Sequence, residues 1–178
     1  MNFGRWSMMK KLRLGSNMSV FPNLKGMEDL EELEMWSTPD DYMDSSAEFI
    51  KSLSQLPNLK SLKWWNCHVP NLSDLSLIKN IELLEITMSG LSYGSEEMNI
   101  QLPSNFSDMK NLRKLTIKTY EGFTLIFPEN IAELSHLEEI DLSNTQIISD
   151  IDFRMKLREG LPNTNLIFGE NFDKLDEL

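Results

Sequence analysis

A nine-residue apolar pattern, L-x-x-L-x-L-x-x-N/C/T, recurs along nearly the whole chain and limits it to folds built by stacking one unit on the next. The six clear copies are MKKLRLGSN from Met9, LEELEMWST from Leu30, LKSLKWWNC from Leu59, IELLEITMS from Ile81, LRKLTIKTY from Leu112 and LEEIDLSNT from Leu137. A degraded seventh copy, NTNLIFGEN, starts at Asn163. A unit of this size cannot bury its own apolar face, so stacked neighbours must bury a continuous core.

The copies are spaced in a way that indicates duplication. Successive copies start 21, 29, 22, 31, 25 and 26 residues apart, and the first four intervals alternate between short and long. We interpret this as a duplicated two-repeat unit. Because strand side chains alternate between faces, two internal columns are predicted. They are Leu33, Leu62, Leu84, Leu115 and Ile140, and beside them Met35, Trp64, Ile86, Ile117 and Leu142.

The chain resembles the leucine-rich repeat family from about Met9 to Asn171. The resemblance implies an α/β fold, a curved solenoid with a parallel concave sheet of about seven short strands. Short helices, 3-10 turns and loops would form the convex side. We expect one domain over residues 1–178, with short ends at 1–8 and 172–178. At the family's asparagine position, where a ladder of side chain to backbone bonds is implied, this chain has Asn17, Thr38, Cys67, Ser89, Thr145 and Asn171. Ser89, and Tyr120 at the same position of its copy, depart from the usual Asn, Cys or Thr.

Two insertions account for the long intervals. Residues 45–56 carry Phe49, Ile50, Leu53 and Leu56 at helical spacing, which predicts a helix on the convex side. Residues 90–101, GLSYGSEEMNIQ, are rich in Gly, Ser and Glu and are predicted to form a loop.

Two tryptophans occupy the same outward position in consecutive copies. Trp36 and Trp65 are both seventh in the pattern, whereas Trp64 holds a core position. Adjacent strands lie roughly 4.8 Å apart, so Trp36 and Trp65 are predicted to be neighbours on the concave face. Leu83, third in the next copy, is expected to face outward too, with Met88 close by at the end of its strand.

This aromatic patch has two interpretations. Trp is enriched among binding hot spots, so Trp36, Trp65, Leu83 and Met88 predict a partner-binding surface. Alternatively, the two rings cover each other and only stabilise the sheet. The binding interpretation predicts that Trp65→Ala weakens partner binding far more than it lowers stability.

Charged residues alternate in sign from one copy to the next. The second position runs Lys10, Glu31, Lys60, Glu82, Arg113, Glu138, and the fifth runs Arg13, Glu34, Lys63, Glu85, Thr116, Asp141. Opposite charges on adjacent strands would each contribute about 0.2–1 kcal/mol. Of these residues, Glu34, Lys63 and Glu85 border the tryptophans and join the predicted partner-binding set. Because these charges largely cancel, we expect the net charge to lie elsewhere, in residues 40–44, 96–97 and the carboxyl-terminal tail.

The formal net charge of -11 disfavours phosphate backbones, so we expect no nucleic-acid partner. The first residues, MNFGRWSMMKKLRLG, contain no long apolar run, so neither a secretory signal nor a membrane segment is expected. A single cysteine excludes an internal disulfide framework. We therefore expect a cytoplasmic, bacterial protein, with a secreted effector as the alternative.

The sequence contains no recognisable catalytic constellation. Cys67 is expected to be a buried structural thiol, and the adjacent His68 does not by itself make a dyad. Two histidines and one cysteine give no metal-ligand spacing, so no cofactor, metal or enzymatic activity is expected. We predict an acidic protein–protein interaction module, monomeric or weakly dimeric, of adaptor, inhibitor, immunity or effector type. The alternative is a repeat fragment of a larger receptor or effector.

Overall fold

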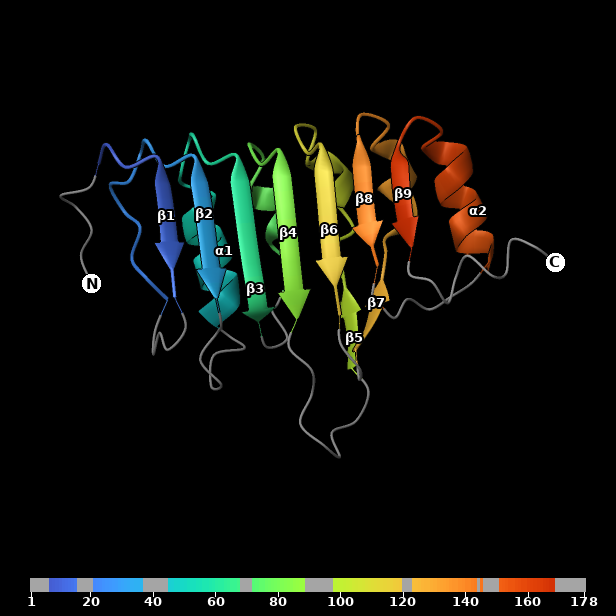
Figure 1. Cartoon of the computed structure of the whole chain (residues 1–178), viewed down its shortest axis with the longest axis horizontal. Coiled ribbons are helices and arrows are strands. Elements are labelled where there is room, and N and C mark those ends of the chain that lie inside the picture. The colour runs from blue at the N-terminus through green and yellow to red at the C-terminus, as the bar shows by residue number, and fades with distance from the viewer. Residues whose placement is uncertain are drawn as a thin grey trace.

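A single sheet of seven parallel strands forms the body of the protein (Figure 1). The computed structural model describes residues 7–15, 21–36, 45–67, 72–88, 98–119, 123–143, 145 and 151–168. In spatial order the strands are β1 (Lys11–Leu14), β2 (Glu32–Trp36), β3 (Ser61–Cys67), β4 (Leu83–Met88), β6 (Lys114–Lys118), β8 (Glu139–Leu142) and β9 (Asn165–Phe168). Each lies within one copy of the apolar pattern, so the predicted parallel sheet is confirmed.

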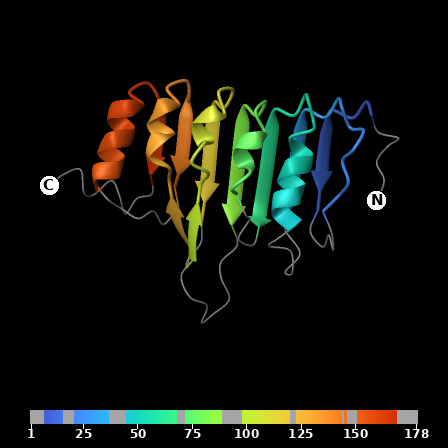
Figure 2. The same cartoon turned by 180° about the vertical axis from the view of Figure 1, so that it is seen from behind.

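One face of this sheet, the covered face, carries the connecting elements (Figure 2). These are α1 (Ser45–Leu53), η1 (Leu75–Leu77), η2 (Phe106–Asp108), η3 (Glu129–Glu133) and α2 (Ile151–Gly160). A second, two-stranded parallel sheet, β5 (Met98–Gln101) with β7 (Phe123–Ile126), extends from the same side. The opposite face of the seven-stranded sheet bears none of these elements, and we call it the open face.

The core lies between the sheet and the covered face. Strand register aligns the pattern's leucine positions, so that Leu33, Leu62, Leu84, Leu115 and Ile140 follow one another across the sheet. The second predicted column, Met35, Trp64, Ile86, Ile117 and Leu142, is likewise buried. Both predicted core columns are therefore confirmed.

Aromatic side chains fill the wide part of this core behind β3. Trp64 is fully buried, and its ring centre lies 5.7 Å from that of Phe21 and 5.9 Å from that of Phe49, both edge-on. Phe21 and Phe49 stack at 4.4 Å. The Trp64 indole N–H has no hydrogen-bond partner in the part of the chain that the structure describes. Packing, rather than hydrogen bonding, therefore holds this ring.

The connections differ in part from the prediction. The predicted helix over 45–56 is present but ends at Leu53. The prediction of a loop over 90–101 is wrong for its last four residues, which form β5 and alternate polar with apolar as M-N-I-Q. Pairing with F-T-L-I of β7 overrides the loop-forming composition that precedes them. Helix α2 was not predicted.

Two sets of side chain to backbone bonds tie the layers together. Thr145, buried, donates its hydroxyl to the carbonyl oxygen of Ile117 one layer earlier, which confirms one rung of the predicted ladder. The other predicted positions, Asn17, Thr38, Ser89 and Asn171 and the side chain of Cys67, lie outside the described residues.

A second set, not predicted, uses the residue just before four of the seven copies of the pattern. Asn58, Asn80 and Asn111 donate to the carbonyl oxygens of Glu28, Pro57 and Lys79 at 2.8–2.9 Å. His136 makes the equivalent contact with Met109 O at 3.3 Å. Each contact reaches back to the preceding layer and satisfies a backbone carbonyl at the start of the sheet.

Candidate functional site

The open face is built by the strict alternation of the strands. In β4, half-buried Leu83, Glu85 and Thr87 alternate with fully buried Leu84, Ile86 and Met88. Strands β6 and β8 alternate in the same way. The third, fifth and seventh pattern positions therefore form rows that run across the sheet on its open face, as predicted.

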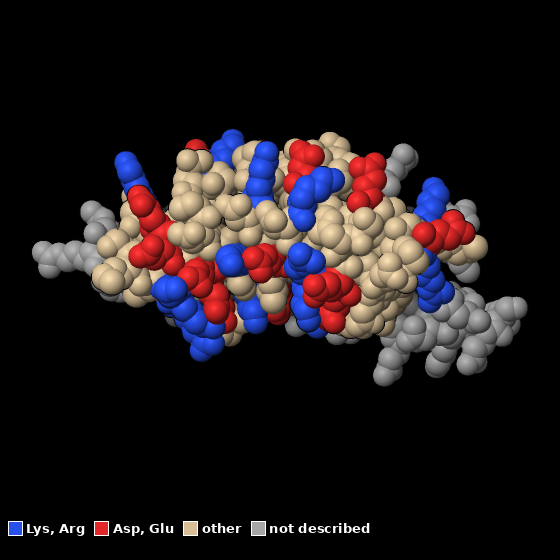
Figure 3. Space-filling model, turned by 90° about the horizontal axis from the view of Figure 1, so that it is seen from above, with Lys and Arg blue, Asp and Glu red and all other residues tan. Residues whose placement is uncertain are grey.

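Ion pairs between adjacent strands cover much of this face. Lys10 pairs with Glu31 at 2.8 Å, Lys60 with Glu82 at 3.4 Å and Arg113 with Glu138 at 3.6 Å. Farther along the strands, Lys63 pairs with Glu85 at 3.8 Å and Lys118 with Asp141 at 3.3 Å. Figure 3, looking down on the end where the strands begin, shows acidic and basic side chains alternating along this side. The predicted cross-strand pairing is confirmed.

These charges cancel. Basic side chains come from β1, β3 and β6, acidic ones come from β2, β4 and β8, each set includes the residues just before its strands, and the two sets are equal in number. The basic set is Lys10, Lys11, Arg13, Lys60, Lys63, Arg113, Lys114 and Lys118, and the acidic set is Glu31, Glu32, Glu34, Glu82, Glu85, Glu138, Glu139 and Asp141. The open face therefore has no net charge, as expected from the sequence.

The excess negative charge belongs to residues whose side chains lie outside the described part. There, the acidic residues are Asp40, Asp41, Asp44, Glu96, Glu97, Glu121, Glu129, Asp150, Asp152, Glu170, Asp173, Asp176 and Glu177, against only Arg5 and Lys174. Thirteen acids less two bases give the whole formal charge of -11. Most of these acids lie in segments that follow the carboxyl end of a strand in the sequence.

Glu34 is unusual because it is a buried carboxylate on the open face. Its side chain is 7% exposed and contacts Lys11 at 3.3 Å and Arg13 more closely. Burial by itself would raise the pKa of Glu34, but hydrogen bonds and the positive charges of Lys11 and Arg13 outweigh it. The pKa of Glu34 consequently lies below its ordinary value.

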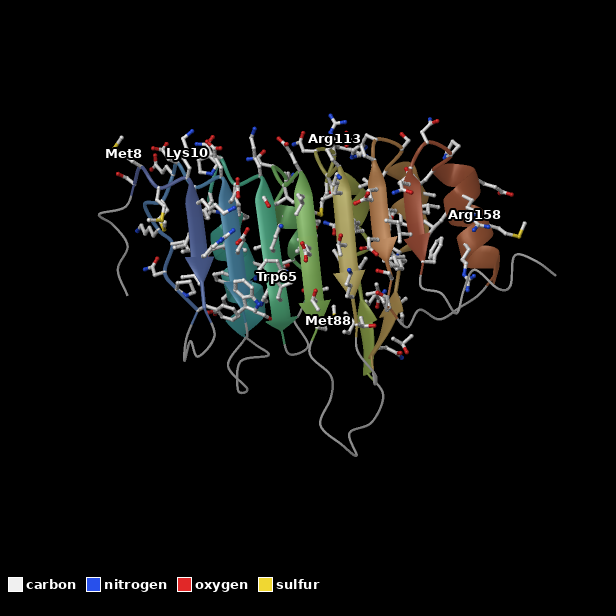
Figure 4. All side chains as sticks on the ribbon, in the orientation of Figure 1. Met8, Lys10, Trp65, Met88, Arg113 and Arg158 are labelled. Atoms are coloured by element: carbon white, nitrogen blue, oxygen red, sulfur yellow. The ribbon has the colours of Figure 1, made fainter. Side chains whose placement is uncertain are left out.

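The two outward tryptophans meet as predicted, at the carboxyl end of the strands. Trp36 pairs with Trp65 in the register of β2 and β3, and the ring centres lie 4.4 Å apart at an angle of 44°. Trp65, labelled in Figure 4, is half-buried. Its indole N–H donates to the Glu85 carboxylate. Lys63 Nζ lies 5.7 Å from the centre of the Trp65 ring. Trp65 is thus held from several sides, while Trp36 remains 44% exposed.

Two predicted members do not belong with this pair. Met88 is fully buried, because it continues the inward alternation of β4, so its predicted place on the binding surface is wrong. Leu83 does face outward, but it pairs with Ser61, four residues and roughly 13 Å along the strand from the Trp65 row. The neighbour of Trp65 on β4 is Thr87, which was not predicted to lie in the patch.

Leu83 instead lines a shallow hollow of about 340 Å³ near the start of the strands. Ser61 lies beside it. The other residues that line the hollow are all charged and include Lys11, Glu32, Lys60 and Lys63. Neither tryptophan lines this hollow. The open face therefore holds two separate features, a charged hollow and an aromatic pair.

Comparison of the sequence with protein-family models and with curated proteins finds no match to either. Among the described residues, no group of three His, Cys, Asp or Glu side chains is arranged to hold a metal ion. Within those same residues, no helix has the length and apolar character needed to cross a membrane.

Proposed function

We propose that this protein is a non-enzymatic protein–protein interaction module built as a leucine-rich repeat solenoid. The register supports the repeat assignment, because equivalent pattern positions face each other in every neighbouring strand pair, apart from a shift at Cys67 at the end of β3. The rung from Thr145 to Ile117 supports it further. Stacked repeats present extended surfaces that suit the binding of a protein partner.

The observation that carries the proposal is the exposure of Trp36 on an otherwise neutral, ion-paired face. Most open-face charges are already paired with a neighbouring strand, so this face offers a partner few free charges of its own. A 44% exposed tryptophan, supported from one side by Trp65, offers a rigid apolar surface. Aromatic side chains of this kind dominate the energy of protein interfaces. The partner is therefore a protein, and the module acts as an adaptor, an inhibitor, an immunity protein or an effector.

Site-specific photo-cross-linking tests this proposal. Benzoylphenylalanine would replace Trp36 in one full-length protein and Met155, which is 54% exposed on α2, in a matched control. In a lysate of the source organism, position 36 should yield a discrete cross-linked protein and position 155 should not. In a pull-down without cross-linker, the parent protein should capture the same protein, and a Trp36→Ala/Trp65→Ala variant, shown to be folded by circular dichroism, should not. Capture by the folded double variant would place the interaction elsewhere.

A further inference from the structure

The exposed tryptophan is flanked unequally by its two neighbouring strands. On the β3 side it contacts Trp65. On the β1 side, the strand pairing ends at Leu14 and Met35, and Gly15 and Trp36 are the next residues after that pair. A Cβ added to Gly15 would meet no heavy atom within 4 Å. Among the described residues, the space above Gly15, next to the end of the β1–β2 pairing, is therefore open, and we call it the Gly15 notch.

The open face already shows which chemistry suits a tryptophan in this setting. Lys63 lies over the ring of Trp65 and is also paired with Glu85. A tryptophan ring attracts cations through its negative face, best when the surroundings are partly dry. Among the described residues no basic side chain lies over Trp36, and Arg13, two residues before Gly15, is engaged by Glu34. Within the described part of the chain, the ring of Trp36 therefore has no cation over it.

Long-range charge favours the same ligand. The whole formal charge of -11 lies outside the balanced, described side chains, and Asp40, Asp41 and Asp44 follow Trp36 within eight residues of sequence. An acidic protein attracts basic partners and speeds their encounter. We infer that the Gly15 notch receives a lysine or arginine side chain of a basic protein partner, which lies against the ring of Trp36. This inference rests on the proposed function, because it names the partner chemistry for the same aromatic pair.

Gly15 allows a test that changes neither charge nor core. Gly15→Leu would fill the notch and cover the adjacent side of Trp36, and the open space around Gly15 should leave folding intact. The matched control is Ser61→Leu, which adds the same side chain to the open face in the hollow beside Leu83. Thermal unfolding of both variants would establish that each is folded.

The probe is a capped nona-arginine peptide, titrated calorimetrically into the full-length protein at about 0.15 M salt, where diffuse attraction is screened beyond ~8 Å. Gly15→Leu and Trp36→Ala should each weaken binding by about fivefold or more, while Ser61→Leu stays within about twofold of the parent. A capped nona-glutamate peptide should not bind. Equal affinity of the parent and a folded Gly15→Leu variant would overturn the inference and leave only diffuse charge attraction.

The two proposals fail in distinguishable ways. If position 36 cross-links to a protein partner but the Gly15→Leu variant still captures that partner and binds nona-arginine as the parent does, the protein-binding function stands and the cation notch is wrong. If the peptide binds in a Gly15-dependent way but position 36 captures no partner, the notch stands as a cation site and the protein-binding function loses its support.

Discussion

The covered and open faces of the sheet use adjacent tryptophans for opposite purposes. Behind β3, Trp64 is fully buried among Phe21 and Phe49, and it makes no hydrogen bond to any described residue. On the open face, Trp65 is half-buried and donates its indole N–H to Glu85, and the ammonium group of Lys63 lies over its ring. Trp64 stabilises the core by filling space. Trp65 interacts through its indole N–H and through the face of its ring.

This contrast separates stability from binding along a single strand. Apolar packing contributes most where a side chain is fully enclosed. Exposed aromatic faces contribute most when a partner covers them. Substitutions on the two faces should therefore have effects that differ in kind as well as in size.

The largest effect is expected from Trp64→Ala. Removing this ring leaves a cavity between β3 and α1, and the free energy of unfolding should fall by about 3–5 kcal/mol. Trp64→Phe should cost much less, because it keeps most of the volume and the lost indole N–H has no described partner. Urea unfolding monitored by circular dichroism measures both. Similar losses for the two variants would mean that a hydrogen bond, not packing, holds Trp64.

A smaller loss is expected from Thr145→Val, which keeps the shape of a buried side chain but removes its hydroxyl. The carbonyl oxygen of Ile117 would lose its partner, at a cost of about 1–3 kcal/mol. Thr145→Ser keeps the hydroxyl and should recover part of that loss. The midpoints of denaturant unfolding, compared between the parent and the two variants at equal m-values, measure these losses. Equal unfolding free energies for the valine and serine variants would show that this hydrogen bond contributes nothing to stability.

The sequence predicts those parts of the fold that repeat. Seven strands, their parallel pairing, both core columns and the cross-strand ion pairs all depend on one period and on strand alternation. The Trp36–Trp65 contact follows from the same two rules. Features outside the pattern were missed or misjudged. Met88 was predicted to be accessible because it lies near the strand end, although alternation alone turns it inward.

A usable signal existed for some of the missed features. Asn58, Asn80 and Asn111 each stand immediately before a copy of the pattern, so their shared position indicated a second ladder. Other features depend on tertiary contact. β5 needs β7 as its partner, and Gly160 of α2 lies so close to η3 that an added Cβ would come within 2.5 Å of Ala132. The Gly15 notch depends on the pairing of β1 with β2, which ends at Leu14 and Met35, just before Gly15 and Trp36.

Glu34 is an exception to the contrast between the two faces, because it is buried although it lies on the open face. Its folded pKa is below the ordinary value of 4.5, so it stabilises the fold above pH 4.5, and that contribution is lost as pH falls through the folded pKa. Glu34→Gln should lower the unfolding free energy at pH 7 by about 1 kcal/mol or less. It should also flatten the fall in stability below pH 4.5. Glu32→Gln, on the same strand but more exposed, is the matched control.

The smallest effect on stability is expected from Trp36→Ala. The ring is already 44% exposed and encloses no core cavity, so the loss should stay below about 1 kcal/mol, mostly from its contact with Trp65. Trp65→Ala should cost more, because it also leaves Glu85 without its indole donor. Thermal unfolding of both variants, read beside their partner capture, separates the two roles. If Trp36→Ala unfolds as readily as Trp64→Ala, the open-face pair is a structural element, and the distinction between the faces fails at the position where the proposed function needs it.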